Sequence, residues 1–317
     1  MAAPVKSGRL KRQMSDGVFL QEKTQKLLKY ARAKDKEDDL KKELEDLNPE
    51  EKRRLCQSRD ERQNTALHYA AKAGNLKTCQ FLVEQGADIN ALGQNKMKPL
   101  QFAARYGDKD KGKEVWMCME WILDEDKKKD RKKEEKEIII DGRDNFSILH
   151  HAIQNTNWEE KPVVVQELIK TGEFKVTDAD KQGNTCLHLA AQFDRQDDHV
   201  LLETFLPSDD KSKDYRSQDY ISQEDLERCI ETKNNVGMTP LHLACAVGNH
   251  DSVKHLLEVA GGAKSISVSE IINNPDSNGS LPISLAITSK NLEMVEILLK
   301  NGATVNEDTI FTAARLV

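Results

Sequence analysis

The stretch Thr239-Pro-Leu-His-Leu-Ala-Cys245 decides the fold, because close variants of it recur along the whole chain. Each copy keeps leucine or isoleucine at its third position and alanine at its sixth; the others are 65–71, 98–104, 147–153, 185–191 and 281–287. A weaker copy begins at Thr309. Segments of one pattern that return after a few tens of residues predict a stack of similar structural units.

The stretch also predicts its local conformation. Thr239 is a suitable helix N-cap, and Pro240 suits the first helical position, where its missing N–H costs nothing. The leucine and alanine lie one turn apart on the same helix face. Glycine stands two residues before three of the copies, as a tight turn with positive φ requires, at Gly183, Gly237 and Gly279. Gln63 and Lys96 occupy this place in two others, so those turns are less well defined by the sequence.

A second helix is predicted after each first one. Residues 76–83 and 292–299 show apolar side chains at helical spacing, and Gly86 and Gly302 follow them as stop signals. Equivalent second helices are predicted at 115–123, 163–169, 200–206 and 253–257. The expected unit is therefore helix, turn, helix and a finger loop, and the expected fold class is all-α.

This pattern resembles the ankyrin-repeat family, whose signature is T-P-L-H-x-A. The resemblance implies a solenoid of about seven repeats, including a degenerate N-terminal one. Residues 1–20 are expected to be a disordered basic N-terminus, 21–55 a degenerate capping repeat and 56–317 the array, with charged inserts near 124–137 and 207–224. The chain ends at Val317, inside a first helix, so we expect a fragment or short isoform of a longer protein.

Composition excludes several classes of function. The net charge of −6, with both signs mixed, argues against a nucleic-acid partner. No apolar run is long enough to span a bilayer, and the N-terminus shows no secretory signal. The six cysteines are scattered, as in reduced proteins of the cytoplasm. We therefore expect a cytoplasmic location, either as a soluble protein or as the cytosolic part of a membrane protein.

No arrangement of residues predicts catalysis, a metal or a cofactor. Nucleotide-binding loops and zinc-protease or serine-hydrolase motifs are absent from the sequence. The motif histidines His68, His150, His188 and His242 lack acidic or cysteine partners at ligand spacing. The family resemblance implies instead that they brace the finger loops. Cys56 and Cys229 lie near finger-loop entries and are expected to be the more exposed cysteines. We expect no enzymatic activity.

The resemblance implies protein partners, bound by the finger-loop tips and by the concave face of the first helices. The candidate contact residues are Arg59, Asp60, Arg62, Gln94, Asn95, Arg143, Asp144, Lys181, Gln182, Lys233, Asn234 and Asp276. Separately, Ser15 follows Arg12 by three residues, as in sites of basophilic kinases.

Two kinds of protein remain as alternatives. The phrases at 64–74 and 98–107, the irregular repeat lengths and the charged inserts look like the N-terminal array of transient receptor potential channels of the ankyrin (TRPA) type. In that case further partners would be the rest of the channel subunit and its homo-oligomer. The alternative is a soluble adaptor or scaffold.

Overall fold

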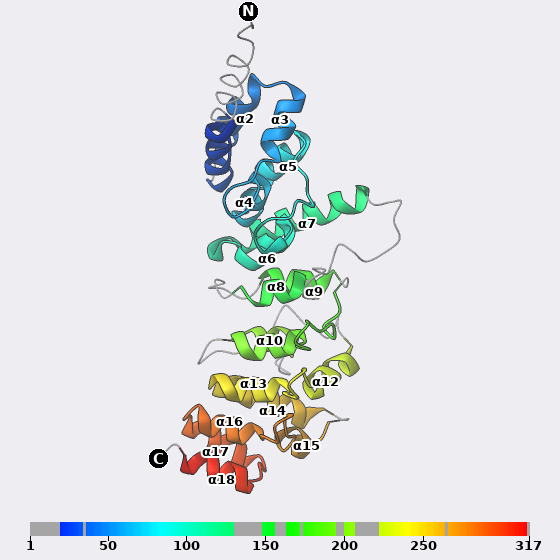
Figure 1. Cartoon of the computed structure of the whole chain (residues 1–317). Helices are drawn as coiled ribbons and strands as arrows, with labels where there is room; N and C mark the ends of the chain where they lie inside the picture. The colour runs from blue at the N-terminus through cyan, green and yellow to red at the C-terminus, as the bar shows by residue number, and fades with distance from the viewer. Residues whose placement is uncertain are drawn as a thin grey trace, which may run out of the picture. The chain divides into compact units, whose positions relative to one another are not determined.

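The computed structural model describes residues 20–33, 36–129, 148–155, 163–171, 174–194, 200–206, 222–263 and 266–315. Chain contacts divide the protein into two units, residues 1–135 and 136–317. Each unit is described by itself. In the described ranges every regular element is a helix (Figure 1).

Unit 1 contains a helix over residues 20–32 and two helical pairs that follow the repeat pattern. Its further elements are α2 (Glu37–Glu45), α3 (Pro49–Cys56), α4 (Ala66–Lys72), α5 (Leu76–Glu84), η1 (Gln94–Lys96), α6 (Pro99–Tyr106), η2 (Lys109–Lys111) and α7 (Gly112–Lys129). The first helices α4 and α6 pack together, as do the second helices α5 and α7, so the unit has two helical layers.

Unit 2 continues the same pattern. Its elements are α8 (Ile148–Ile153), α9 (Val163–Lys170), α10 (Cys186–Phe193), α11 (Val200–Phe205), α12 (Gln223–Glu231), α13 (Pro240–Val247), α14 (His250–Gly262), α15 (Val268–Ile272), α16 (Pro282–Thr288), α17 (Leu292–Lys300) and α18 (Glu307–Ala314). The first helices α8, α10, α13, α16 and α18 pack on one another in chain order, and α11, α14 and α17 form the second layer (Figure 1).

The motif residues form the interface between repeats. Leu67 and Ala70 in unit 1, and Leu187 and Ala190 in unit 2, are fully buried. Burying one such leucine stabilises the fold by about 1.5–3 kcal/mol. The small alanine allows the backbones of neighbouring helices to approach closely. The N-terminal repeat is packed in the same way, with Leu28 in the helix over 20–32 and Leu40 in α2 both buried.

Three short helices were not expected, and they change the predicted position of two cysteines. α3, α12 and α15 each lead directly into a finger loop. The last turns of α3 and α12 fold Cys56 and Cys229 inward, and both side chains are buried. The prediction that these cysteines are exposed was therefore wrong. Desolvation raises the pKa of each thiol to about 12.

The structure describes only the edges of the two predicted inserts. α7 continues to Lys129, so the first part of the charged 124–137 segment is helical, and Asp126 is buried there and accepts a hydrogen bond from Asn90 at 2.7 Å. α12 begins at Gln223, inside the predicted 207–224 insert. The rest of both inserts, the basic N-terminus up to residue 19 and Ser15 lie outside the described residues.

The register of the seventh motif copy was also wrong. Asn306 caps α18, with its Oδ1 accepting from the Thr309 N–H at 2.8 Å, so the helix begins three residues earlier than the sequence suggested. Thr309 therefore lies inside the helix and is buried. Phe311, the third residue of the copy counted from Thr309 and so aligned with the buried leucine of the other copies, is 66% exposed.

Candidate protein-interaction surface

One acidic or amide side chain folds each of four described finger loops, whereas the loop at 93–97 has Gly93 in this place. In the first loop, Asp60 Oδ1 accepts from the backbone N–H groups of Arg62 and Asn64, both at 2.9 Å. The same pair of bonds, to the second and fourth following residues, is made by Asp180, Asn234 and Asp276. A side chain that binds its own backbone in this way fixes a turn.

The residue before the end of each turn adopts a left-handed conformation. Gly183, Gly237 and Gly279 have φ of 78°, 76° and 83°, as the sequence predicts. Gln63 and Lys96 have φ of 67° and 59° in the corresponding places. The loop therefore keeps its shape where the sequence departs from glycine, at a conformational cost that glycine does not have.

The motif histidines join one repeat to the next. His188 Nδ1 accepts from the Thr185 N–H at 3.2 Å, so the ring proton must lie on Nε2. Nε2 then donates to the carbonyl oxygen of Met238 at 3.0 Å. His68, His150 and His242 make the equivalent bond to the carbonyls of Met97, Asn184 and Ser280, at 3.0, 3.2 and 3.3 Å. Each acceptor is the residue before the N-cap of the next first helix.

This bonding requires neutral histidines. Burial lowers the pKa of His68 and of His188 to about 4, and it also lowers the pKa of His150 and of His242. The histidines brace the finger loops, as the family resemblance implies. Among the residues that the structure describes, no group of three or more His, Cys, Asp or Glu is arranged to hold a metal ion.

Neighbouring finger loops in unit 2 also bind each other directly. The Asn235 N–H donates to the Gln182 carbonyl at 2.8 Å, and the Asn235 side chain donates to the Lys181 carbonyl at 2.6 Å. The Ser277 N–H donates to the Val236 carbonyl at 3.1 Å. These bonds hold the loop tips in a fixed spacing, so that side chains of successive loops form one continuous edge.

The sequence-predicted contact residues fall into two groups. Asp60, Asp180, Asn234 and Asp276 are bound to their own loops, and Asp180 and Asp276 are buried. The exposed members are Arg59, Arg62, Asn95, Lys181, Gln182 and Lys233, while Gln94 is half-buried. Arg143 and Asp144 lie outside the described residues. The surface that the loops offer to a partner is therefore formed mainly by cations and amides.

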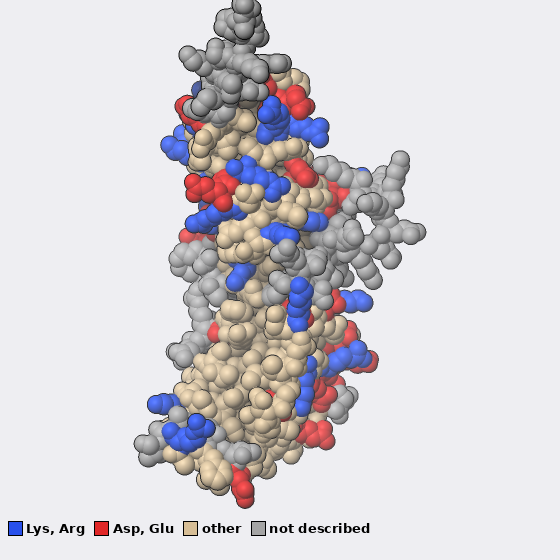
Figure 2. All heavy atoms as spheres, in the orientation of Figure 1, with Lys and Arg blue, Asp and Glu red and all other residues tan. Residues whose placement is uncertain are grey.

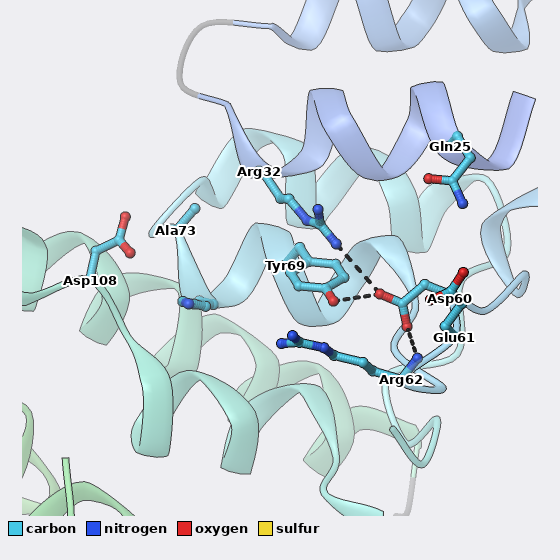
Figure 3. Close-up of a pocket in the computed structure, with 9 residues that line it drawn as sticks. Gln25, Arg32, Asp60, Glu61, Arg62, Tyr69, Ala73 and Asp108 are labelled. Atoms are coloured by element: carbon cyan, nitrogen blue, oxygen red, sulfur yellow. Dashed lines mark hydrogen bonds and ion pairs between the residues drawn. The ribbon is translucent and has the colours of Figure 1, made fainter. Parts of the chain in front are cut away.

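Sequence analysis missed a groove of about 570 Å³ in unit 1, between the helix over 20–32, the first finger loop and α4 (Figure 3). Asp60 lies at its centre, where Oδ2 accepts from the Tyr69 hydroxyl at 2.5 Å and lies 3.4 Å from Arg32 Nη2. The Arg32 guanidinium carbon lies 3.8 Å from the centre of the Tyr69 ring, a cation–π contact. The signal in the sequence was the tyrosine directly after His68, where three of the other five good copies have leucine.

The first helices of unit 2 present a different surface. Leu243 and Leu285 stand at the motif position that Tyr69 occupies in α4, and both are half-buried. Figure 2 shows a largely uncharged face over α13 and α16, with acidic and basic residues toward its edges. The two units therefore differ in the chemistry of their first-helix face.

Comparison with known families agrees with this geometry. A family model described as ankyrin repeats (3 copies) matches residues 220–309, and a second, ankyrin repeats (many copies), matches residues 55–110. The chain therefore contains ankyrin repeats in both matched ranges. The matched range in each unit contains a histidine bond of the kind described above. It is the bond of His68 to Met97 in unit 1 and the bond of His242 to Ser280 in unit 2.

Curated relatives of this ankyrin-repeat protein include subfamily A member 1 of the transient receptor potential cation channels. The human channel is 25% identical over 244 residues, which are 75% of this chain and 18% of the channel. The Drosophila melanogaster channel is 26% identical over 274 residues, 85% of this chain and 19% of the channel. The chain thus spans about a fifth of the length of these relatives.

Solved structures support the ankyrin fold. The ankyrin repeat domain of human ASB11 superposes with a TM-score of 0.55 at 16% identity, covering 84% of this chain and 93% of that domain. A chain from the complex of the Bdellovibrio bacteriovorus predatory endopeptidase Bd0816 with immunity protein Bd3460 gives 0.50 at 19% identity, covering 77% of this chain and 99% of its own. At these identities the likeness concerns the fold alone.

The ankyrin repeats make this chain a protein-interaction module. Within the described ranges, no helix has the length and apolar character needed to cross a membrane.

Proposed function

We propose that this ankyrin array is the cytosolic interaction region of a TRPA-type cation channel. The observation that carries the proposal is the extent of the alignment: the relationship to the human and Drosophila melanogaster channels covers 75% and 85% of this chain. It thus extends over most of the repeats of this chain.

The geometry supports a docking role for such a region. The histidine bonds tie each first helix to the next finger loop, and the loops of unit 2 are bonded to one another. Binding surfaces on a rigid scaffold lose little conformational entropy when a partner docks. We propose that the exposed loop residues Arg59, Arg62, Asn95, Lys181, Gln182 and Lys233 contact that partner, which is either another part of the channel subunit or a second subunit.

Cell fractionation tests the channel assignment. An antibody raised against the exposed loop residues 59–63 should detect a membrane-bound species much larger than the 35.9 kDa of this chain. A second antibody, against the exposed residues of α17, should detect the same band and serves as the control for specificity. If both antibodies detect only a protein of about the mass of this chain in the high-speed supernatant, the adaptor alternative replaces the channel proposal.

A further inference from the structure

The central carboxylate of the unit 1 groove is not available to a ligand. Asp60 Oδ1 accepts from two backbone N–H groups, and Oδ2 accepts from the Tyr69 hydroxyl and faces Arg32 (Figure 3). Asn64 donates in turn to the Tyr69 hydroxyl at 3.2 Å. Because these bonds satisfy both carboxylate oxygens, Asp60 orients Arg32 and Tyr69 and does not itself offer a charge to a ligand.

Two other cations of the groove have no acidic partner. Arg62 is exposed and Lys72 is half-buried, and among the described residues neither forms an ion pair within 4.0 Å. Figure 3 shows the Arg62 side chain extending from the finger loop toward the middle of the groove, below the Tyr69 ring. Of the other acids in the lining, Asp108 faces Lys111 at 3.4 Å, and the exposed Glu61 forms no ion pair among the described residues. The lining charges that no ion pair neutralises are therefore those of two cations, Arg62 and Lys72, and of one acid, Glu61.

An aromatic row continues from the groove along the first helices. Tyr69 meets Phe102 edge-on with ring centres 5.9 Å apart, and Phe102 lies 4.9 Å from Tyr106. Tyr69 and Phe102 are only 8% and 4% exposed, so this row belongs to the core and offers a ligand little contact area. Selection of a ligand therefore depends on the cations of the groove.

This chemistry is specific to unit 1. Four residues after the motif histidine, α4 has Lys72 and α6 has Arg105 in the equivalent place. The described first helices α10, α13 and α16 of unit 2 have Gln192, Ala246 and Thr288 there. Cations at this position are therefore not a requirement of the repeat, since the same fold forms without them.

We propose that the unit 1 groove binds an acidic peptide segment, with peptide carboxylates paired to Arg62 and Lys72. This inference rests on the interaction role of the array and is independent of the channel assignment. Electrostatic attraction between the cations and the peptide favours their encounter, and salt screens this attraction. The affinity for the peptide should therefore decrease as the ionic strength rises.

Fluorescence anisotropy of a labelled peptide tests the proposal on the full chain. The probe is a short peptide of alternating glutamate and alanine with one central leucine, compared with the same peptide carrying glutamine in place of glutamate. The paired reversal Arg62→Glu with Lys72→Glu should weaken binding of the acidic probe by at least about tenfold. Lys77→Glu is the matched control, because Lys77 is an exposed lysine in the same repeat on the second helix α5, and it should change binding less than about twofold.

Hydrogen exchange of the complex locates the site without any substitution. Protection by the acidic peptide should fall on residues 59–73 and not on α17. The neutral variant pair Arg62→Gln with Lys72→Gln, checked for an unchanged helical circular dichroism spectrum, should also lose binding.

Three results would overturn the proposal: equal binding of the glutamate and glutamine probes, equal loss in the Lys77→Glu control, or binding only when the probe carries phosphoserine. Such a failure leaves the fractionation result of the channel proposal unaffected. A purely soluble native protein would conversely leave the groove chemistry standing, so the two proposals fail separately.

Discussion

The ring Nε2 of His188 lies 3.0 Å from the carbonyl oxygen of Met238, a residue 50 positions later in the chain. This bond connects α10 to the loop that leads into α13, across the long 207–221 segment, which lies outside the described residues. The same bond recurs at His68, His150 and His242. It is thus the polar link that fixes neighbouring repeats while the leucines and alanines supply their apolar interface.

Replacing His188 by alanine should destabilise the protein. It leaves the Thr185 N–H and the Met238 carbonyl without their buried partner, which costs about 2–3 kcal/mol of unfolding free energy, as urea denaturation would measure. His188→Gln is the informative control, because Gln101 at the same motif position of α6 accepts from the Lys98 N–H at 2.8 Å. The unfolding free energy of the His188→Gln variant should lie between those of the wild type and of His188→Ala. Equal unfolding free energies of all three proteins would contradict the bracing role.

Stability should decrease in mild acid because of these histidines. Burial lowers the pKa of His68 and of His188 from 6.5 to about 4, so between these values the unfolded chain binds protons that the folded chain does not. Their contribution is therefore complete above pH 6.5 and is lost as the pH falls toward 4, on the order of 3 kcal/mol per histidine at most. Carboxylates titrate in part of this range as well. The His188→Gln variant should accordingly show a shallower loss of urea midpoint between pH 7 and pH 5 than the wild type, and parallel profiles would argue against a neutral, buried His188.

Two glycines separate the effect of backbone conformation from that of steric contact. Gly237 and Gly279 have nearly the same φ, 76° and 83°. A methyl group at Gly237 would collide with the Ser277 backbone nitrogen of the next loop, whereas one at Gly279 would meet nothing within 4 Å. Gly279→Ala should therefore cost about 1 kcal/mol through φ alone, and Gly237→Ala clearly more. Thermal unfolding of the two variants measures the difference, and equal midpoints would show that the loop contact is absent.

Gln63 has a left-handed backbone conformation, so its replacement by glycine should have the opposite effect on stability to the glycine-to-alanine changes. Its φ of 67° is the conformation that glycine adopts in the other loops, so Gln63→Gly should stabilise the protein or leave it unchanged, with a gain of up to about 1 kcal/mol. The exposed Gln57, the C-cap of α3 with φ of −89°, is the control, because Gln57→Gly relieves no strain and should destabilise. A loss of stability in Gln63→Gly as large as that in Gln57→Gly would contradict the assigned conformation.

The six cysteines should be slow to react in the folded protein. All are buried, and desolvation raises the pKa of Cys56 and of Cys229 to about 12, which suppresses the reactive thiolate. Titration with a maleimide reagent should label few thiols in buffer and all six in concentrated urea. Fast labelling of Cys56 or Cys229 under native conditions would show that α3 or α12 opens readily.

The sequence predicts most of the fold and less of the interaction surface, for a physical reason. Helices α10, α13 and α16 follow from signals within a few residues: a cap or proline, a leucine or isoleucine three residues before an alanine, and a glycine turn. Helix α4 has the cap and the spacing, with Gln63 in place of the glycine. Such signals do not report long-range contacts. The burial of Cys56 and Cys229 depends on short helices that are stable only because the repeat above them covers their apolar side chains.

The interaction surface depends on the same kind of contact. Arg32 and Tyr69 are far apart in the chain, and only the packing of the helix over 20–32 against α4 brings them within 3.8 Å. The predicted contact residues Asp60, Asp180 and Asp276 show the role of contacts within a loop. Each carboxylate closes its own turn, which their position in the sequence did not indicate.

The most direct test of the central claim is peptide sequencing by mass spectrometry of the native species that carries this array. The protein would be extracted from membranes with detergent and isolated with an antibody against residues 59–63. We expect peptides of this chain to occur in one polypeptide with further ankyrin repeats and with apolar, membrane-spanning segments. A polypeptide that contains the sequence up to Val317 and nothing beyond it, recovered only from the soluble fraction, would contradict the channel assignment.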